Sequence, residues 1–525
     1  MRNAPAAPLA LALVLALSGG LAAQERRPLP DIGSSAGSVI SPAEQAEYGA
    51  MTLSQLRNYG YVLEDPLLAG WLQSVGKRLG ASSDDPSQPF TFFLLRERQI
   101  NAFATLGGYI GVNAGLVLAA DDEDEVAAVL SHEIAHVTQE HVLRGVEQAQ
   151  RDQVPVLLAM LGAIALAQGS DSNSSDDAVM AAVVGAQGLM VQRQIDYTRS
   201  NEAEADRIGI RTLARSGYAP TAMAGFFEQL QSVVRSTDTR ETTPDYLQTH
   251  PVTTSRISEA RDRARQIADS GAGFVPGDRP RDNLLLPSSL TIATGAAAAH
   301  GDDFPWARER LRVLTADTPA TAVREYERLA RAGALDDAQR YGLALAHYLD
   351  GHAAQAVGEF EALLGAHPRE PWLELALAQA QARSGKTAVA DATFDALHAR
   401  MPGSRAVALT YAATLNERNT PDAGRRAQAL LRPLLNSAGD DPLFQLTFAR
   451  ASEIAGDAVR AGEAYAEAEY LNGRPERALV QLGLLKKRDD LDYYARARID
   501  ARIAAITPTV LELRRQGIRD QDLER

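Results

Sequence analysis

Residues 123–142 read EDEVAAVLSHEIAHVTQEHV, and this stretch decides the fold of the chain around it. Its apolar residues recur at helical spacing, which predicts an amphipathic helix from Glu123 to about Arg151. On such a helix His132 and His136 lie one turn apart on the same face, where both imidazoles can bind one metal ion. Glu133 is placed to activate a water molecule at that ion. The stretch therefore predicts a metal site on a helix.

A catalytic zinc site needs a third protein ligand and one position left open to water. The chain has no cysteine, so this ligand must be an aspartate, a glutamate or another histidine. Residues 199–206 are typical of a helix, with Glu202 and Asp206 on one face and Glu204 about 160° away. Glu202 can reach the metal, and Asp206 can accept a hydrogen bond from the far nitrogen of a ligand imidazole. A solvated acidic helix face is the alternative.

The neighbouring segments indicate a small α+β unit in which helices dominate. Helical periodicity runs from Ala43 to about Arg57 and from Pro66 to Leu79. Residues 90–95 and 108–112 are typical of strands. The fold class expected here is mainly α, with a small sheet in the metal-binding half.

The second half of the chain repeats every 34 residues. The recurring positions are Tyr326, Phe360 and Phe394; Tyr341 and Leu375; Gly351 and Gly385; and Pro368 and Pro402. Paired helices of this period, with glycine in the turn and proline at the end, resemble tetratricopeptide repeats. Each pair leaves an apolar face that the next pair must cover, so the pairs should stack into an α-helical solenoid. We expect its concave face to bind proteins.

Length, charge and the N-terminus restrict the function classes. A chain of 525 residues is expected to form at least two domains, and its net charge of −14 argues against a nucleic-acid binder. Arg2, the Leu/Ala-rich residues 9–17 and the small residues up to Ala23 predict a cleaved secretory signal. An uncleaved membrane anchor is the alternative. We therefore expect a periplasmic protein that is soluble or peripheral to a membrane.

Two apolar stretches, residues 154–167 and 178–191, flank a polar segment. As helices each would reach about 21 Å, which is shorter than the ~30 Å hydrocarbon layer of a bilayer. A buried hairpin with a polar tip is one interpretation. A lid over the site, or a surface that touches a membrane or an unfolded protein, is the other.

These observations predict five consecutive parts of the chain. They are a signal peptide at 1–23, a polar arm at 24–42, a metallopeptidase domain at 43–268, a linker at 269–303 and a repeat domain at 304–525.

Four ordered motifs resemble those of the HtpX/CAAX-prenyl-protease family of gluzincin zinc peptidases. They are NAFATLGGYIGVN at 101–113, HEIAH at 132–136, EAEAD at 202–206, and His250-Pro251 with Arg256-Ile257. The similarity covers about residues 43–265. Several motifs in the same order are far more specific than HEIAH alone.

The resemblance implies one Zn²⁺ per chain, held by His132, His136 and Glu202, with Glu133 as general base. Asp206 and Arg256 are then expected behind the ligands. Gly108, Tyr109, Ile110, Gly111 and Val112 are expected to form an edge strand that aligns an extended substrate.

Two histidines have less certain places. His141 would point about 140° away from His136 on a continuous helix, which favours a structural role. His250 precedes Pro251, ahead of a helical stretch, so it belongs to a loop that can fold over the metal. It is expected to stabilise the oxyanion or to occupy the open zinc position in a latent state, with an ordinary surface histidine as the alternative.

The expected function is therefore metal-assisted hydrolysis of internal peptide bonds. Capture along an edge strand would suit misfolded or stalled outer-membrane β-barrel proteins as clients. The repeats would dock clients or the barrel assembly machinery, and a chaperone activity can accompany the protease. A repeat scaffold with a structural zinc and a prenyl-peptide protease are the competing hypotheses. The catalytic Glu133 disfavours the first, and the export signal with no spanning helices disfavours the second.

Overall fold

The computed structural model describes residues 40–145, 147–148, 195, 197–236, 246–247, 250–270 and 303–515. The predicted signal at 1–23 and the apolar stretches at 154–167 and 178–191 lie outside these residues, as do most of the predicted arm and linker. Among the described helices, none is long and apolar enough to cross a membrane.

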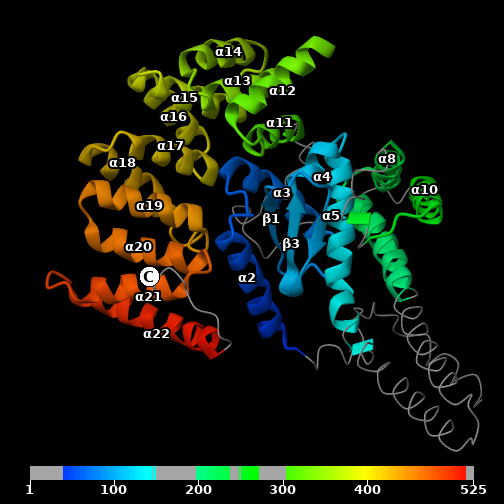
Figure 1. Cartoon of the computed structure of the whole chain (residues 1–525), viewed down its shortest axis with the longest axis horizontal. Coiled ribbons are helices and arrows are strands. Elements are labelled where there is room, and N and C mark those ends of the chain that lie inside the picture. Colours follow the sequence, from blue (N-terminus) through cyan, green and yellow to red (C-terminus); the bar gives the residue numbers. More distant parts are fainter. Residues whose placement is uncertain are drawn as a thin grey trace, which may run out of the picture.

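The first half contains helices around a small sheet (Figure 1). Its elements are α2 (Pro42–Asn58), α3 (Pro66–Ala81), β1 (Thr91–Leu95), β2 (Ala102–Ala104), η2 (Leu106–Gly108), β3 (Tyr109–Asn113), α4 (Ala114–Ala119), α5 (Glu123–Thr138), α8 (Ala222–Ser236) and α10 (Thr254–Asp269), with residues 197–215 also helical. Side chains cap several of these helices. Ser41 and Glu44 form a capping box at α2, and Asp65 accepts the first amides of α3.

The sheet corrects one prediction. Its strand order is β1-β3-β2, with β1 parallel and β2 antiparallel to β3. The predicted edge strand, Gly108 to Val112, mostly coincides with β3, which is the central strand and is hydrogen-bonded on both sides. The edge strand beside the predicted metal helix is β2. This strand has only three residues, too few to show the alternation by which a strand is recognised.

A second correction concerns the long helix. Helix α5 ends at Thr138 rather than continuing to about Arg151. Gln139 caps it, and Glu140 adopts a left-handed backbone with φ of 52° before residues 141–145 become helical again. The chain therefore changes direction just after the HEIAH motif.

The second half is entirely helical where it is described, which confirms the predicted fold class. Its elements are α11 (Phe304–Leu314), α12 (Pro319–Ala332), α13 (Asp337–Leu349), α14 (Ala353–Ala366), α15 (Pro371–Arg383), α16 (Thr387–Arg400), α17 (Arg405–Glu417), α18 (Pro421–Leu431), η4 (Arg432–Leu434), α19 (Pro442–Ala455), α20 (Ala458–Leu471), α21 (Pro475–Lys486) and α22 (Tyr493–Arg515). The repeated aromatics Tyr326, Phe360 and Phe394 are fully buried. Gly351 and Gly385 turn the chain between paired helices at φ of 92° and 87°, a conformation that favours glycine.

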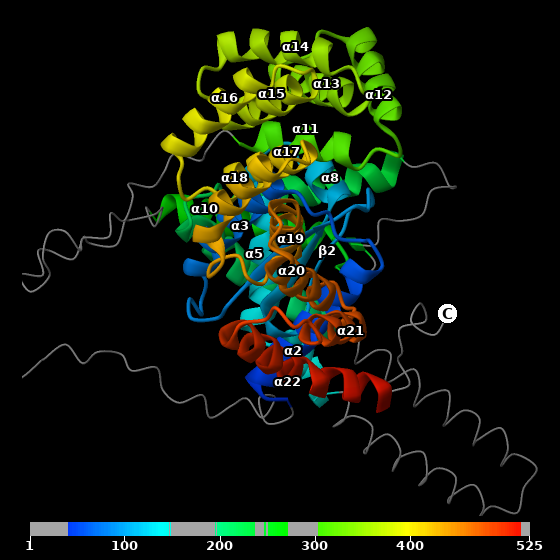
Figure 2. The same cartoon turned by 90° about the vertical axis from the view of Figure 1, so that its left-hand side faces the viewer.

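The helical pairs form an arc that passes along α3 and α2 (Figures 1 and 2). Trp71 of α3 lies 6.2 Å from Phe304 of α11 between ring centroids, and one hydrophobic cluster includes residues from both halves. Arg310 also reaches back to the Asp65 cap of α3. Part of the surface that we expected to bind proteins therefore contacts the chain's own first half.

Candidate metal centre

Two histidines and one glutamate of helix α5 lie close together in a buried position. Asp122 caps its first turn, and the residues from Glu125 to Ala135 are buried, which fixes the rotation of the helix against the core. His132 and Glu133 are each 1% exposed. The Nε2 atoms of His132 and His136 lie 3.0 Å apart, so both rings are directed at the same place.

The helix at residues 197–215 crosses α5 closely enough to add a carboxylate. At Gly209, a Cβ atom would lie 3.2 Å from the backbone of His132, so glycine permits this close approach. Seven residues earlier, Glu202 is 4% exposed. Its oxygens lie 3.4 Å from His132 Nε2 and 3.3 Å from His136 Nε2.

The donor atoms fit a tetrahedral zinc ion. Bonds of about 2.0–2.1 Å in tetrahedral geometry hold neighbouring ligand atoms about 3.3 Å apart. The two Nε2 atoms lie 3.0 Å apart, one Glu202 oxygen lies 3.3 Å from His136 Nε2, and the other lies 3.4 Å from His132 Nε2, all close to this value. Two imidazoles with one carboxylate are also a donor set that zinc accepts. His250 completes a group of four residues whose ligand atoms lie within 4.8 Å of one another.

The charges at this point favour a cation. Burial opposes a charged imidazole, but Asp206 and Glu202 outweigh it and raise the pKa of His132 to about 10. Burial would raise the pKa of Glu202, but hydrogen bonds from the surrounding histidines hold it well below its usual range. The site thus stabilises positive charge between its donor atoms.

Asp206 and Arg256 lie behind the donor atoms. Asp206 Oδ1 lies 3.0 Å from His132 Nδ1, the ring nitrogen that faces away from the cluster. Arg256 donates two hydrogen bonds to Asp206, at 2.7 and 2.8 Å, and its third nitrogen lies 2.9 Å from Glu202. The guanidinium also donates to the carbonyl of Pro251 at 2.9 Å. One buried arginine thereby joins two carboxylates to the loop that carries His250.

His250 lies against the cluster rather than at the surface. Its Nδ1 is 2.9 Å from Glu202 and 3.3 Å from His132 Nε2, and its Nε2 is 3.7 Å from Glu133. Tyr246 is fully buried and stacks on the imidazole, with ring centroids 4.7 Å apart. The backbone amide of His250 donates to the Tyr246 carbonyl at 2.7 Å. These contacts hold the ring toward the donor atoms.

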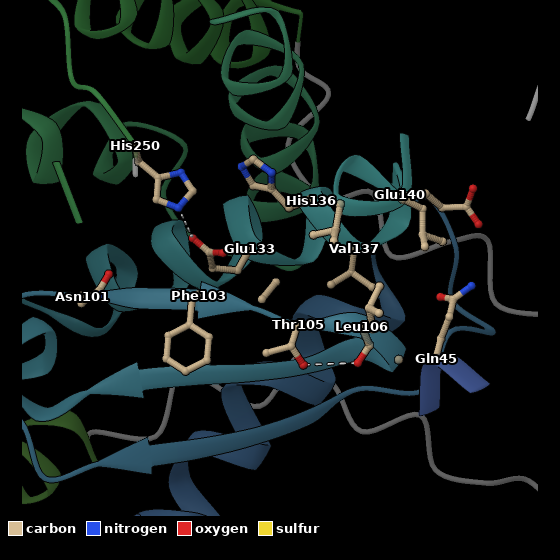
Figure 3. A pocket seen from close by; sticks show the side chains of 14 residues that line it. Gln45, Asn101, Phe103, Thr105, Leu106, Glu133, His136, Val137, Glu140 and His250 are labelled. Atoms are coloured by element: carbon tan, nitrogen blue, oxygen red, sulfur yellow. Dashed lines mark hydrogen bonds and ion pairs between the residues drawn. The ribbon is translucent and has the colours of Figure 1, made fainter. Parts of the chain in front are cut away.

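A pocket of about 360 Å³ opens beside these residues (Figure 3). Glu133, His136 and His250 line one wall, β2 and η2 line another, and Val137, Val142 and Leu143 add apolar surface. Glu133 Oε1 is buried and has no hydrogen-bond partner among the described residues. The pocket therefore combines a carboxylate oxygen that accepts no hydrogen bond from the described residues, the donor cluster and an edge strand.

Sequence reasoning did not assign site roles to three residues at this centre. Tyr246 lies four positions before His250, but a single aromatic residue in a polar segment carries no recognisable signal. His141 and Glu204 lie behind His136, joined to each other at 3.2 Å. Burial, helped by the neighbouring His136, lowers the pKa of His141 to about 4. On a continuous helix this ring would point away from the site. Because α5 ends at Thr138, the ring instead lies beside His136.

Sequence comparisons with known proteins cover the residues of this centre. The sequence model of peptidase family M48 matches residues 66–264, which include all four predicted site motifs. The chain is 31% identical over 475 residues to the Yersinia pestis protein named beta-barrel assembly-enhancing protease, and the alignment covers 90% of either chain. The chain belongs to peptidase family M48. This confirms both the family resemblance and the prediction of a metallopeptidase.

Two further relatives match over a shorter part of the chain. The chain is 43% identical over 238 residues to a putative beta-barrel assembly-enhancing protease of Vibrio cholerae and 40% identical over 239 residues to the Escherichia coli K12 protein of that name. These alignments cover 45% and 46% of this chain and about half of each relative, 48% and 47%. An export signal, peptidase motifs and helical repeats in this order predict a protein similar to the periplasmic β-barrel assembly-enhancing protease, and the names of these relatives agree that the chain resembles such a protease.

Proposed function

We propose that this M48 protein is a zinc-dependent endopeptidase that cleaves misfolded or stalled outer-membrane β-barrel proteins in the periplasm. The observation that carries the proposal is the pocket in which Glu133, the His132–His136–Glu202 donor cluster and the edge of β2 meet. Each of the three parts has a separate task in peptide hydrolysis.

The chemistry divides between the ion and the side chains. When bound, zinc supplies a Lewis acid that polarises the scissile carbonyl and lowers the pKa of a water molecule toward 7. Glu133 accepts the proton of the attacking water through its buried carboxylate and passes it to the leaving amine. Asp206 holds His132 in the tautomer whose Nε2 is free to bind, and Arg256 keeps Asp206 and Glu202 in place.

Strand β2 is the edge that we propose for substrate alignment. Thr105 N donates to Tyr109 O, and Asn113 N donates to Asn101 O, so the odd-numbered residues of β2 face β3. In an antiparallel ladder the intervening residues then direct their backbone groups outward. Ala104 thus offers an N–H and a C=O to an extended chain in the pocket. Main-chain capture of this kind tolerates many sequences and suits unpaired β-strands.

We propose a latent resting state held by His250. Its Nδ1 lies among the donor atoms of the other three residues, which supports occupation of the position that catalysis needs open. Stabilisation of the oxyanion by the same ring is the second candidate, supported by the position of its Nε2 near Glu133.

The remaining assignments follow the sequence and the relatives' names. We propose residues 43–268 as the catalytic domain and 304–525 as a repeat domain that selects clients and docks on the barrel assembly machinery. A chaperone-like activity and a peripheral membrane contact are part of this proposal. A signal at residues 1–23 would direct the chain to the periplasm.

The decisive experiment is proteolysis of an unfolded β-barrel protein by the full chain, with and without a chelator. Cleavage should require zinc and should be absent in Glu133→Gln. A natively folded barrel protein is the matched control and should survive. Cleavage that persists in the chelator would overturn the metallopeptidase assignment, and equal cleavage of folded and unfolded substrate would overturn the client class.

A further inference from the structure

His136 has a partner on the side that faces away from the donor cluster. Its Nδ1 lies 2.9 Å from Nδ1 of His141, and the two rings are nearly perpendicular, with an interplanar angle of 79°. His141 is 5% exposed. The contact is therefore a partly buried hydrogen bond between two imidazoles.

The backbone is shaped to make this contact. Helix α5 ends at Thr138, and Glu140 takes a left-handed conformation that residues with a side chain rarely adopt. The amide of Glu140 bonds to Val137 O at 2.9 Å, and its carbonyl accepts the amide of Arg144 at 2.9 Å, so both sides of the bend are hydrogen-bonded. The bend returns His141 to the ring of His136.

The hydrogen bonds have one consistent direction. If His136 Nε2 binds the metal, its proton must sit on Nδ1, which then donates to His141 Nδ1. The proton of His141 must consequently sit on Nε2, which donates to Glu204 Oε2 at 3.2 Å. Glu204 also accepts from Arg144 at 2.8 Å and from Arg207 at 3.4 Å. This series of hydrogen bonds ends at Arg144 and Arg207, and the direction of the bonds is fixed because arginine can only donate.

We propose that His141, backed by Glu204, is the positioning residue that holds His136 as a metal ligand. The inference rests on the proposed metal site. The two histidines of the HEIAH motif are thus supported differently, because His132 Nδ1 lies 3.0 Å from the carboxylate of Asp206 whereas His136 Nδ1 faces a second imidazole. Without His141, the Nδ1–H of His136 would lose its acceptor, and the ring could rotate or change tautomer.

The test is zinc affinity, measured on the full chain by competition with a chromophoric chelator. His141→Ala should weaken zinc binding by roughly 10- to 100-fold, the range usual for such supporting residues. His141→Asn should recover most of this loss, because its amide oxygen can take the place of Nδ1 as acceptor. Glu204→Gln, at a side chain that is 27% exposed, should have a smaller effect in the same direction.

His347→Ala is the matched control, since His347 also pairs with a glutamate, at 2.9 Å from Glu359, but lies in α13 of the second half. Its zinc affinity should equal that of the parent. Equal affinity of His141→Ala and the parent, or no recovery in His141→Asn, would overturn the assignment. A parent that binds no zinc would instead overturn the proposed function, and the assignment with it. Circular dichroism of the metal-free variants checks that each is folded.

Discussion

Asp65 and Arg310 form a buried ion pair that joins α3 to α11 across 245 positions of sequence. Two guanidinium nitrogens donate to the two carboxylate oxygens, at 2.9 and 2.6 Å, and the side chains are 8% and 9% exposed. Asp65 also caps α3. The pair therefore ties the two halves of the chain together at a helix terminus.

Replacing Arg310 by leucine should destabilise the protein by about 3–5 kcal/mol, because it leaves the Asp65 carboxylate buried without its partner. Arg450→Leu removes an exposed arginine that pairs with Glu453, and should change stability far less, because exposed ion pairs are weak. Chemical denaturation of both variants measures the difference. Similar midpoints for the two would show that the halves are not coupled through this pair.

Glu133→Gln should retain zinc and lose about 10²- to 10⁴-fold in peptidase rate, because the change removes the proton acceptor but no ligand. Metal content and cleavage are to be measured on the same sample. Activity close to that of the parent would contradict the role of Glu133 as base.

Zinc should stabilise the folded protein through its three proposed ligands. At a free concentration of 100 times the dissociation constant, the gain is about 2.7 kcal/mol, and a chelator should remove it. His132→Ala, His136→Ala and Glu202→Ala should each abolish most of the gain. Thermal unfolding with and without zinc tests this, and an unchanged response in any of the three would remove that residue from the ligand set.

Ala104→Pro should impair substrate alignment without disturbing the sheet. Proline removes the outward N–H of β2, whereas the bonds from β2 to β3 involve the neighbouring residues. Losing one main-chain hydrogen bond between β2 and the substrate should lower kcat/KM for an extended peptide by roughly 3- to 10-fold. Phe103→Pro, which breaks the ladder itself, should unfold the strand. A normal kcat/KM in Ala104→Pro would exclude β2 as the aligning edge.

His250→Ala should raise the basal cleavage of a generic unfolded substrate. If His250 stabilises the closed state by ~1–3 kcal/mol, its removal should raise the cleavage rate by about 5- to 150-fold. The rates must be compared at equal zinc occupancy, because His250 also contacts Glu202. A lower rate would support the oxyanion role instead, and an unchanged rate would eliminate both.

The parts that could be predicted from the sequence depend on short-range spacing. His132 and His136 are one helical turn apart, and Glu202 and Asp206 are likewise, so their shared faces follow from the helix period alone. The repeats were recognisable because Phe360 and Phe394 recur in a fixed register. That the helix of His132 and His136 meets the helix of Glu202 and Asp206 was implied only by the family resemblance, since spacing does not place one helix against another.

The parts that could not be predicted depend on single residues or on distant pairing. Strand β2 is too short to show a period, so its neighbour β3 was mistaken for the edge. The end of α5 has no proline or glycine to mark it, and Glu140 adopts its left-handed conformation without a sequence signal. The contact of His141 with His136 could therefore not be predicted from the sequence. The contact of Trp71 with Phe304 depends on how two distant segments pack.

The core shared by α3 and α11 also sets an order of folding events. A ribosome makes the chain from its N-terminus at roughly 5–20 residues per second, so the 245 positions between Asp65 and Arg310 take about 12–50 s to synthesise. During that time the part of α3 around Trp71 that packs on α11 lacks its partner and stays open to aggregation or to a chaperone. The catalytic half can reach its final packing only after part of the helical half has been made, so a chain truncated before α11 would present an incomplete core.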